Sequence, residues 1–208
     1  MKADIYNIAG EKTGNSVDLS EAVFGIEPNE HAVYLAVKQY NAHQRQGTHK
    51  AKERGEITGS TRKIKKQKGT GTARAGSIKN PLFKGGGRVF GPRPRTYTIK
   101  LNKKVKSIAR ASALAAKMNG GQVVVIEDFN FDAPKTSSYH NMLKSFESEN
   151  VKTLLVTGDH NTNVYLSGRN CKKSDVTPAA DLNVYQILNA QKLLISESAI
   201  AKINEMYS

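Results

Sequence analysis

A segment of about sixty residues constrains this chain more than any other feature, because it has no pattern that leads to regular structure. From Asn41 to Lys106 the chain carries 19 Lys and Arg residues and two acidic ones, a net charge of +17. The whole chain is +14, so the remaining residues sum to −3. Ten glycines and three prolines interrupt positions 47–94, and neither helical nor strand periodicity continues through them. Such a segment buries too little apolar surface to order itself and requires a polyanion, usually a nucleic acid.

The flanking residues show the patterns of an ordinary α/β domain. The strand-like segments are 3–8, 122–127, 152–157, 175–177 and 192–196, with a turn at 10–15. The helix-like segments are 29–40, 102–119, 137–146, 162–169, 182–189 and 198–206. Apolar strands that alternate with amphipathic helices predict a three-layer, doubly-wound-like α/β sandwich with a mostly parallel sheet. The basic loop is expected as an insertion after the first helix, which gives a body of residues 1–44 and 96–208 and a loop of residues 45–95.

The helix predicted at 102–119 continues the basic surface onto the body. Its apolar face is expected to consist of Val105, Ile108, Ala109, Ser112 and Ala116, and Lys103, Lys106 and Arg110 are expected on the opposite face. Four aromatic residues in or near the basic segment, Tyr40, Phe83, Phe90 and Tyr97, are candidates for stacking on unpaired bases. Packing of the two phenylalanines on protein is an equal alternative.

Enzymatic interpretations find little support in the residues. Gly69-Thr70-Gly71 begins like a dinucleotide-binding turn, but Arg74 stands where the third glycine belongs, and no strand precedes it. The five histidines are scattered, and the acidic residues at predicted strand ends fit turns and caps better than catalysis. The single cysteine, Cys171, excludes an intramolecular disulfide and is expected to be a small buried residue. We therefore expect no cofactor, no metal and no small-molecule substrate.

The composition also bears on location. No stretch approaches the roughly 20 apolar residues that a membrane span requires, so no membrane partner is expected. The chain begins without a signal-like apolar run, which predicts a cytoplasmic protein. Arginine, lysine and glycine in one irregular segment suit folded RNA better than a regular duplex groove, because they contact phosphates and allow close backbone approach.

Several short sequence motifs in this segment resemble those of the bacterial family of large ribosomal subunit protein four. The matching motifs are Arg45-Gln46-Gly47-Thr48-His49, Arg54-Gly55-Glu56-Ile57-Thr58-Gly59, Lys66-Gln67-Lys68-Gly69-Thr70-Gly71, Ala73-Arg74-Ala75-Gly76-Ser77-Ile78 and Gly85-Gly86-Gly87-Arg88-Val89-Phe90-Gly91-Pro92. The likeness extends over essentially the whole chain. The chain departs from the family pattern at Ile64, which stands among lysines where the family often has a Pro-Trp-Arg motif.

The resemblance implies a structural protein that binds large-subunit (23S) rRNA early in assembly. It also implies a loop that contacts several rRNA domains, with a tip that lines the exit tunnel opposite large-subunit protein twenty-two and along the path of the nascent polypeptide. The implied rRNA-binding residues are Arg45, His49, Lys50, Lys52, Arg54, Arg62, Lys63, Lys65, Lys66, Lys68, Arg74, Lys79, Lys84, Arg88, Arg93, Arg95, Lys100, Lys103, Lys104, Lys106 and Arg110. The implied tunnel tip consists of Arg62, Lys63, Ile64, Lys65, Lys66, Gln67, Lys68, Gly69, Thr70, Gly71, Thr72 and Arg74.

Two alternative functions stay open at this point. The same surface would suit a regulatory protein that binds its own messenger leader. An α/β enzyme with a basic lid is the remote alternative, and it would require a small-ligand site in the body.

Overall fold

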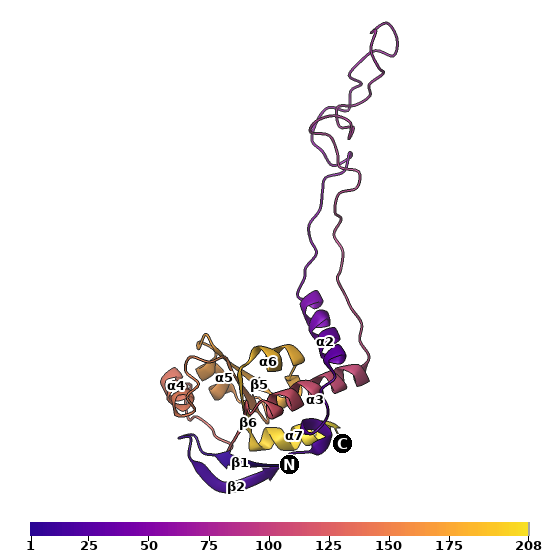
Figure 1. The fold of residues 1–208 in the computed structure, drawn as a ribbon. Coiled ribbons are helices and arrows are strands. Elements are labelled where there is room, and N and C mark those ends of the chain that lie inside the picture. Colours follow the sequence, from indigo (N-terminus) through magenta and orange to yellow (C-terminus); the bar gives the residue numbers. More distant parts are fainter. Residues whose placement is uncertain (208) are drawn as a thin grey trace. The chain divides into compact units, whose positions relative to one another are not determined.

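One six-stranded sheet organises the body of the protein. The computed structural model describes residues 1–207 (Figure 1). The strands are β1 (Lys2–Tyr6), β2 (Lys12–Asp18), β3 (Val123–Ile126), β4 (Thr153–Thr157), β5 (Ser174–Pro178) and β6 (Lys192–Ser196). They lie in the order β2-β1-β3-β6-β4-β5, and only the β1–β2 pair is antiparallel. The predicted mostly parallel α/β sheet is thus confirmed.

Helices pack against the sheet. They are α1 (Glu21–Phe24), α2 (Glu30–His43), α3 (Lys103–Asn119), α4 (Thr136–Ser145), α5 (Thr162–Gly168), α6 (Val184–Asn189), α7 (Glu197–Tyr207) and the short 3₁₀ helix η1 (Ala179–Asp181). Side-chain caps begin several of them, because Asn, Asp and Ser oxygens accept from first-turn N–H groups. Asn161 accepts from Val164 N at 3.2 Å in α5, and Asn183 accepts from Gln186 N at 2.8 Å in α6.

The strands alternate buried side chains between two apolar clusters, because successive residues of a strand point to opposite faces of a sheet. In β6, Leu193 and Ile195 belong to the cluster shared with α3, α6 and α7, whereas Leu194 belongs to the cluster shared with α4 and α5. In β4, Leu154 and Leu155 divide in the same way. Apolar residues on both faces explain why these strands read as continuous hydrophobic runs.

Three details of the predicted body were wrong. The segment 10–15, expected as a turn, contains the start of β2, and the short helix α1 was missed, so the basic segment follows the second helix and not the first. In α3, Ile108 and Ala116 were expected on the buried apolar face, but both are exposed, and 47% of the surface of Ile108 is accessible to solvent. Burial in α3 does not follow a single stripe, because the five successive residues from Ala111 to Ala115 are all buried, whereas Arg110 and Ala116 on either side of them are not.

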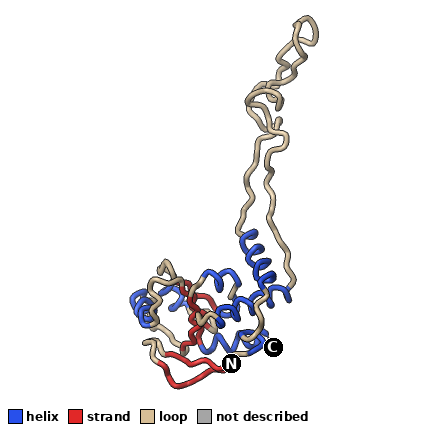
Figure 2. The backbone as a smooth tube through the Cα atoms, in the orientation of Figure 1, coloured by secondary structure: helices blue, strands red, loops and turns tan. Residues whose placement is uncertain are grey.

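The chain divides into two compact units, residues 1–41 with 100–208, and residues 42–99. We call the second the basic unit. All of its residues are described, and apart from Ala42 and His43, which end α2, they form no helix or strand (Figure 2). Both apolar clusters lie entirely within the first unit, the body. Within residues 42–99 only Gly87 is buried, so the basic unit has no hydrophobic core of its own.

Candidate nucleic-acid interface

The basic unit consists of two limbs, one that runs outward from residue 42 and one that returns to residue 99, and the two hydrogen-bond to each other at intervals. Arg95 N donates to Gly47 O at 3.1 Å, Ala51 N donates to Pro92 O at 2.9 Å and Arg88 N donates to Lys52 O at 3.0 Å. Farther along the limbs, Ile64 N donates to Gly76 O at 3.0 Å and Ser77 Oγ donates to Ser60 O at 3.1 Å. These bonds are isolated and do not form a continuous ladder. The two limbs are therefore in register without being a β-hairpin.

Several glycines permit this close approach of the limbs. A Cβ atom on Gly47 would lie 2.0 Å from Arg95 O, and Gly47 has a left-handed φ of +64°. A Cβ on Gly87 would lie 2.4 Å from Arg54 N, and one on Gly91 would lie 2.3 Å from the Ala51 Cβ. No L-residue with a side chain fits such distances without movement of backbone. These glycines therefore serve contacts within the protein, in addition to the approach to RNA that the sequence suggested.

Both acidic residues of the basic unit form ion pairs that join its parts. Glu53 pairs with Arg93 of the returning limb at 2.7 Å, and Glu56 pairs with Lys50. The hydrogen bond from Lys50, together with one from the Glu53 backbone N–H, lowers the pKa of Glu56 below its ordinary value. The two carboxylates thus stabilise the limbs, and no further acidic group is available within the unit.

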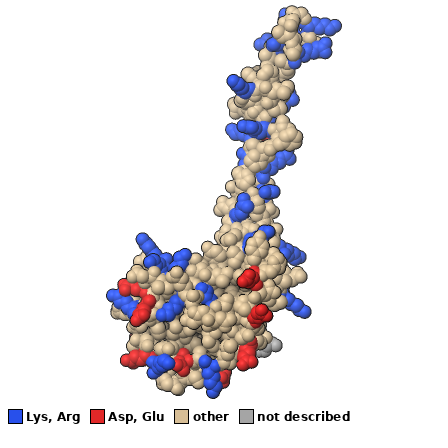
Figure 3. All heavy atoms as spheres, in the orientation of Figure 1, with Lys and Arg blue, Asp and Glu red and all other residues tan. Residues whose placement is uncertain are grey.

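The basic unit has a large excess of unpaired positive charge. Its residues include 15 Lys and Arg against the two glutamates, a net charge of +13. Apart from Lys50 and Arg93, none of these cations has a carboxylate partner among the described residues. All but Lys65 and Lys79 are exposed, and His49 is exposed as well. Figure 3 shows Lys and Arg side chains recurring along the segment, with acidic side chains gathered on the body.

The turn between the limbs lies within the predicted tip, residues 62–74. Gly69 and Gly71 have φ values of +81° and +62°, and a Cβ at either position would meet nothing within 4 Å. Glycine is therefore favoured at these two positions by the left-handed backbone conformation and not by a lack of space for a side chain. Lys65 Nζ donates to Thr72 Oγ1 at 2.8 Å, and Lys63 donates to Gln67. Ile64, 46% exposed, lines a hollow together with Arg62 and Lys66.

The four aromatic candidates are not equivalent. Tyr40 stacks on Tyr185, with ring centroids 4.5 Å apart and an angle of 13° between planes. The guanidinium carbons of Arg45 and Arg95 lie 3.7 and 4.7 Å from the ring centre of Tyr97. A hydrogen bond from Arg95 lowers the pKa of this tyrosine. Tyr40 and Tyr97 thus already have partners within the chain.

The two phenylalanines differ from these tyrosines. Phe90 is 99% exposed and Phe83 is 37% exposed. The side chain of Phe90 therefore has both faces of its ring open to a base or to another protein, and sequence alone did not separate it from the other three.

The first turn of α3 adds a cationic site to the body. Lys103, Lys104 and Lys106 are exposed, and no acidic residue offsets them in this turn. Cations at a helix N-terminus oppose the helix dipole, each by about 0.3–1 kcal/mol. An arrangement that lowers helix stability in the isolated protein is favourable once an anion binds there. Arg110, also predicted, is half-buried, with its guanidinium carbon 5.9 Å from the Tyr207 ring centre.

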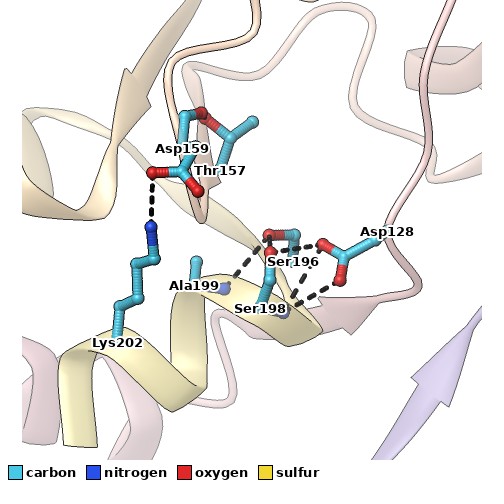
Figure 4. A network of polar contacts seen from close by, with 7 residues as sticks. All are labelled: Asp128, Thr157, Asp159, Ser196, Ser198, Ala199 and Lys202. Carbon is cyan, nitrogen blue, oxygen red and sulfur yellow. Dashed lines mark hydrogen bonds and ion pairs between the residues drawn. The ribbon is translucent and has the colours of Figure 1, made fainter. Parts of the chain in front are cut away.

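At the carboxyl ends of β3, β4 and β6, polar side chains hold the start of α7 (Figure 4). Asp128 accepts from Ser198 Oγ at 2.6 Å and from Ser198 N at 3.2 Å. Ser196 Oγ accepts from Ala199 N at 3.3 Å, and Asp159 pairs with Lys202. The prediction that the acidic residues at strand ends serve turns and caps is confirmed for Asp128, whereas the Asp159 carboxylate forms an ion pair with Lys202 instead of a cap. Their hydrogen-bonding capacity is used for structure.

Cys171 lies after α5, half-buried against the α4–α5 cluster, less buried than expected. Among residues 1–207 no three His, Cys, Asp or Glu side chains come together as metal ligands. Over the same residues no helix is long and apolar enough to cross a bilayer.

The fold and the charge distribution define an α/β protein with a large cationic insertion. The model of the ribosomal protein L4/L1 family matches residues 17–206. "Large ribosomal subunit protein uL4" of Flavobacterium psychrophilum is 59% identical over 208 residues, with both chains covered completely. The protein of the same name from Flavobacterium johnsoniae is 58% identical over 208 residues, again with complete coverage of both. That of Parabacteroides distasonis is 52% identical over 207 residues, covering 100% of this chain and 99% of the relative.

The chain therefore belongs to the ribosomal protein L4/L1 family. It is a ribosomal protein of the large subunit and not an enzyme, and its location is the ribosome of the cytoplasm. The resemblance to this family that was inferred from the glycine-rich motifs is confirmed.

Proposed function

We propose that this protein binds large-subunit (23S) rRNA as a structural constituent that acts early in subunit assembly, through the basic unit. The observation that carries the proposal is the unneutralised charge of residues 42–99. Thirteen cations lack a carboxylate partner in a unit that has no apolar core. Such a unit gains stability only from an external polyanion, and phosphates supply the required charge at close spacing.

The paired limbs suggest how this charge is presented. Interlimb hydrogen bonds and the ion pairs of Glu53 and Glu56 use backbone groups and both acids, which leaves the remaining cationic side chains, except Lys65 and Lys79, exposed. Side chains that diverge from two limbs in register can contact phosphates of more than one RNA segment. This supports contacts with several rRNA domains. If about 8–10 cations reach phosphates, log K against log salt has a slope on the order of −6 to −9.

We also propose that the tip, residues 62–74, lines the polypeptide exit tunnel near large-subunit protein twenty-two. The resemblance to the family supports this position, together with the tight glycine turn and the absence of acidic residues from the tip. Ile64 is exposed there and offers an aliphatic surface to a passing nascent polypeptide. Site-specific crosslinking from position 64 in translating ribosomes is expected to capture nascent chains. Crosslinks to rRNA alone would contradict the tunnel position.

The experiment that tests the proposed function is sedimentation of large subunits after a high-salt wash. A protein buried among rRNA segments is expected to stay with the subunits, and with early assembly intermediates. A second measurement is the salt dependence of binding to deproteinised large-subunit rRNA. A protein found only in the free pool, or bound with a slope near zero, would contradict the proposal. Recovery on its own messenger leader alone would instead favour a regulatory function.

A further inference from the structure

The body has its own charge polarity, separate from the basic unit. Because β3, β6, β4 and β5 are parallel and in register, their amino ends share one edge of the sheet and their carboxyl ends share the other. Lys152 precedes β4, Lys172 and Lys173 precede β5, and Lys192 begins β6. All four lysines therefore lie at the amino edge. None of them was among the residues that the sequence nominated.

The lysines of this edge have neutral partners. Lys152 Nζ donates to Asn189 Oδ1 at 2.9 Å, and Lys173 Nζ donates to Asn150 O at 2.9 Å. Lys192 Nζ donates to Phe146 O at 2.5 Å. No ion pair joins any of them to a carboxylate within the described residues. Lys152, Lys173 and Lys192 are thus each held by one hydrogen bond to an uncharged oxygen.

Two acidic residues, Asp175 and Glu149, line the hollows of this edge, and neither forms an ion pair with these lysines. Asp175 accepts from Gln186 Nε2 at 3.0 Å and from Val176 N at 2.9 Å. Glu149 lies 2.9 Å from His140 Nε2. Two adjoining hollows share Lys172, Lys173 and Ser174 in their linings, and Lys152 lines one of them. The edge is thus a concave surface with three exposed lysines around it.

The opposite edge has the reverse charge. Glu127, Asp128 and Asp159 follow β3 and β4, and Glu197 begins α7 directly after β6. Of the cations, Lys202 faces this edge and is paired with Asp159. Phosphates approaching the carboxyl edge would meet carboxylates, whereas phosphates approaching the amino edge would meet four lysines against two acidic residues, Asp175 and Glu149. The sign difference between the two edges gives the body a preferred orientation toward a polyanion.

We infer that the amino edge of the sheet, with Lys152, Lys172 and Lys173 at its rim, is a second phosphate-contacting RNA surface, and that the carboxyl edge faces away from RNA. The inference rests on the proposed rRNA-binding function and adds to it a contact made by the body. An RNA backbone fits better than an acidic protein, because no exposed large apolar side chain that would anchor a protein partner lines the two hollows. Its polar lining of Ser174, Asn150 and Asn189 can hydrogen-bond to phosphate and sugar oxygens.

The test compares two triple variants of the full chain that lose equal charge. Lys152→Gln with Lys172→Gln and Lys173→Gln removes the rim. Lys12→Gln with Lys135→Gln and Lys202→Gln removes three lysines elsewhere on the body. Binding of each to deproteinised large-subunit rRNA is measured across a salt series. Three lost phosphate contacts reduce the steepness of log K against log salt by about 2–3. The control triple is expected to keep the wild-type slope.

A charge-retaining variant guards against misfolding. Lys152→Arg with Lys172→Arg and Lys173→Arg is expected to keep the wild-type slope. Equal slopes for the rim triple and the control triple overturn the inference, as does loss of slope in the Arg variant. If the wild-type protein itself shows no steep slope, the proposed function fails, and not this inference alone.

Chemical acetylation of lysines gives a second readout. In the complex with rRNA, Lys152, Lys172 and Lys173 are expected to be protected, while Lys135 and Lys202 stay reactive. Rim lysines that react as fast as in the free protein overturn the inference. So does protection that occurs in assembled subunits but not with rRNA alone, because that pattern assigns the edge to a protein partner.

Discussion

Gly47→Ala tests whether the paired limbs are the conformation that binds RNA. Gly47 has a φ of +64°, and its new Cβ would lie 2.0 Å from Arg95 O and 2.9 Å from the Tyr97 ring. A left-handed alanine costs about 1–2 kcal/mol. The contact with Arg95 O cannot be relieved by a rotamer, so the limbs must separate. Their hydrogen bond from Arg95 N, worth about 0.5–1.5 kcal/mol, is then lost.

The sum is about 1.5–3.5 kcal/mol against the paired conformation. If that conformation binds rRNA, the Kd rises by about 12- to 300-fold. The melting temperature of the body is expected to stay the same, because both apolar clusters lie outside residues 42–99. The assay is filter binding or fluorescence anisotropy with large-subunit rRNA at one fixed salt concentration, beside a thermal melt.

Gly76→Ala is the matched control. Gly76 has no left-handed φ, and a Cβ there meets nothing within 4 Å, so its binding is expected to match the wild type. A Gly47→Ala protein that binds within threefold of the wild type would refute the reasoning. That result would mean that RNA selects a conformation in which the limbs are apart at Gly47.

Three further predictions concern single contacts and the independence of the body. Asp128→Ala removes the acceptor for Ser198 N and is expected to lower stability by about 0.5–2 kcal/mol, whereas exposed Asp132→Ala leaves the melting temperature nearly unchanged. The pKa of Glu56 is expected below 4.5 in an NMR titration, since Lys50 donates to the carboxylate. The contact therefore stabilises the folded unit above pH 4.5 and is lost as pH falls through the lowered pKa; an ordinary pKa that Lys50→Gln leaves unmoved would contradict this. A chain in which a short flexible linker replaces residues 42–99 is expected to unfold cooperatively near the wild-type temperature, and a broad, non-cooperative melt would contradict separate folding.

The sequence predicted the central strands well because they are buried on both faces. β6, Lys192–Ser196, has the predicted bounds and contains the apolar run Leu193-Leu194-Ile195. β2 was missed for the opposite reason: it is polar, contains Gly14 and is exposed at nearly every position. Its strand conformation depends on hydrogen bonds to β1, which no local pattern records. The four residues of α1 are likewise too few to show helical periodicity.

The candidate RNA-binding site likewise has features that the sequence predicted and features that it could not predict. Charge and glycine content indicated the basic segment, since these depend on residue type alone. The limb register could not be predicted, because it rests on backbone contacts at Gly47, Gly87 and Gly91 and not on side-chain patterns. The amino-edge lysines were missed because they are far apart in sequence, and only the parallel register brings Lys152 and Lys173 to one edge.

The central claim is that residues 42–99 are the principal RNA-contacting part of the protein. Its most direct test is residue-by-residue crosslinking in assembled large subunits, with a photoreactive amino acid placed at exposed positions along the basic unit and at matched positions on the carboxyl edge of the body. We expect rRNA crosslinks along both limbs and through the tip, and few from positions beside Asp159. Crosslinks confined to the body, with a silent basic unit, would contradict the account.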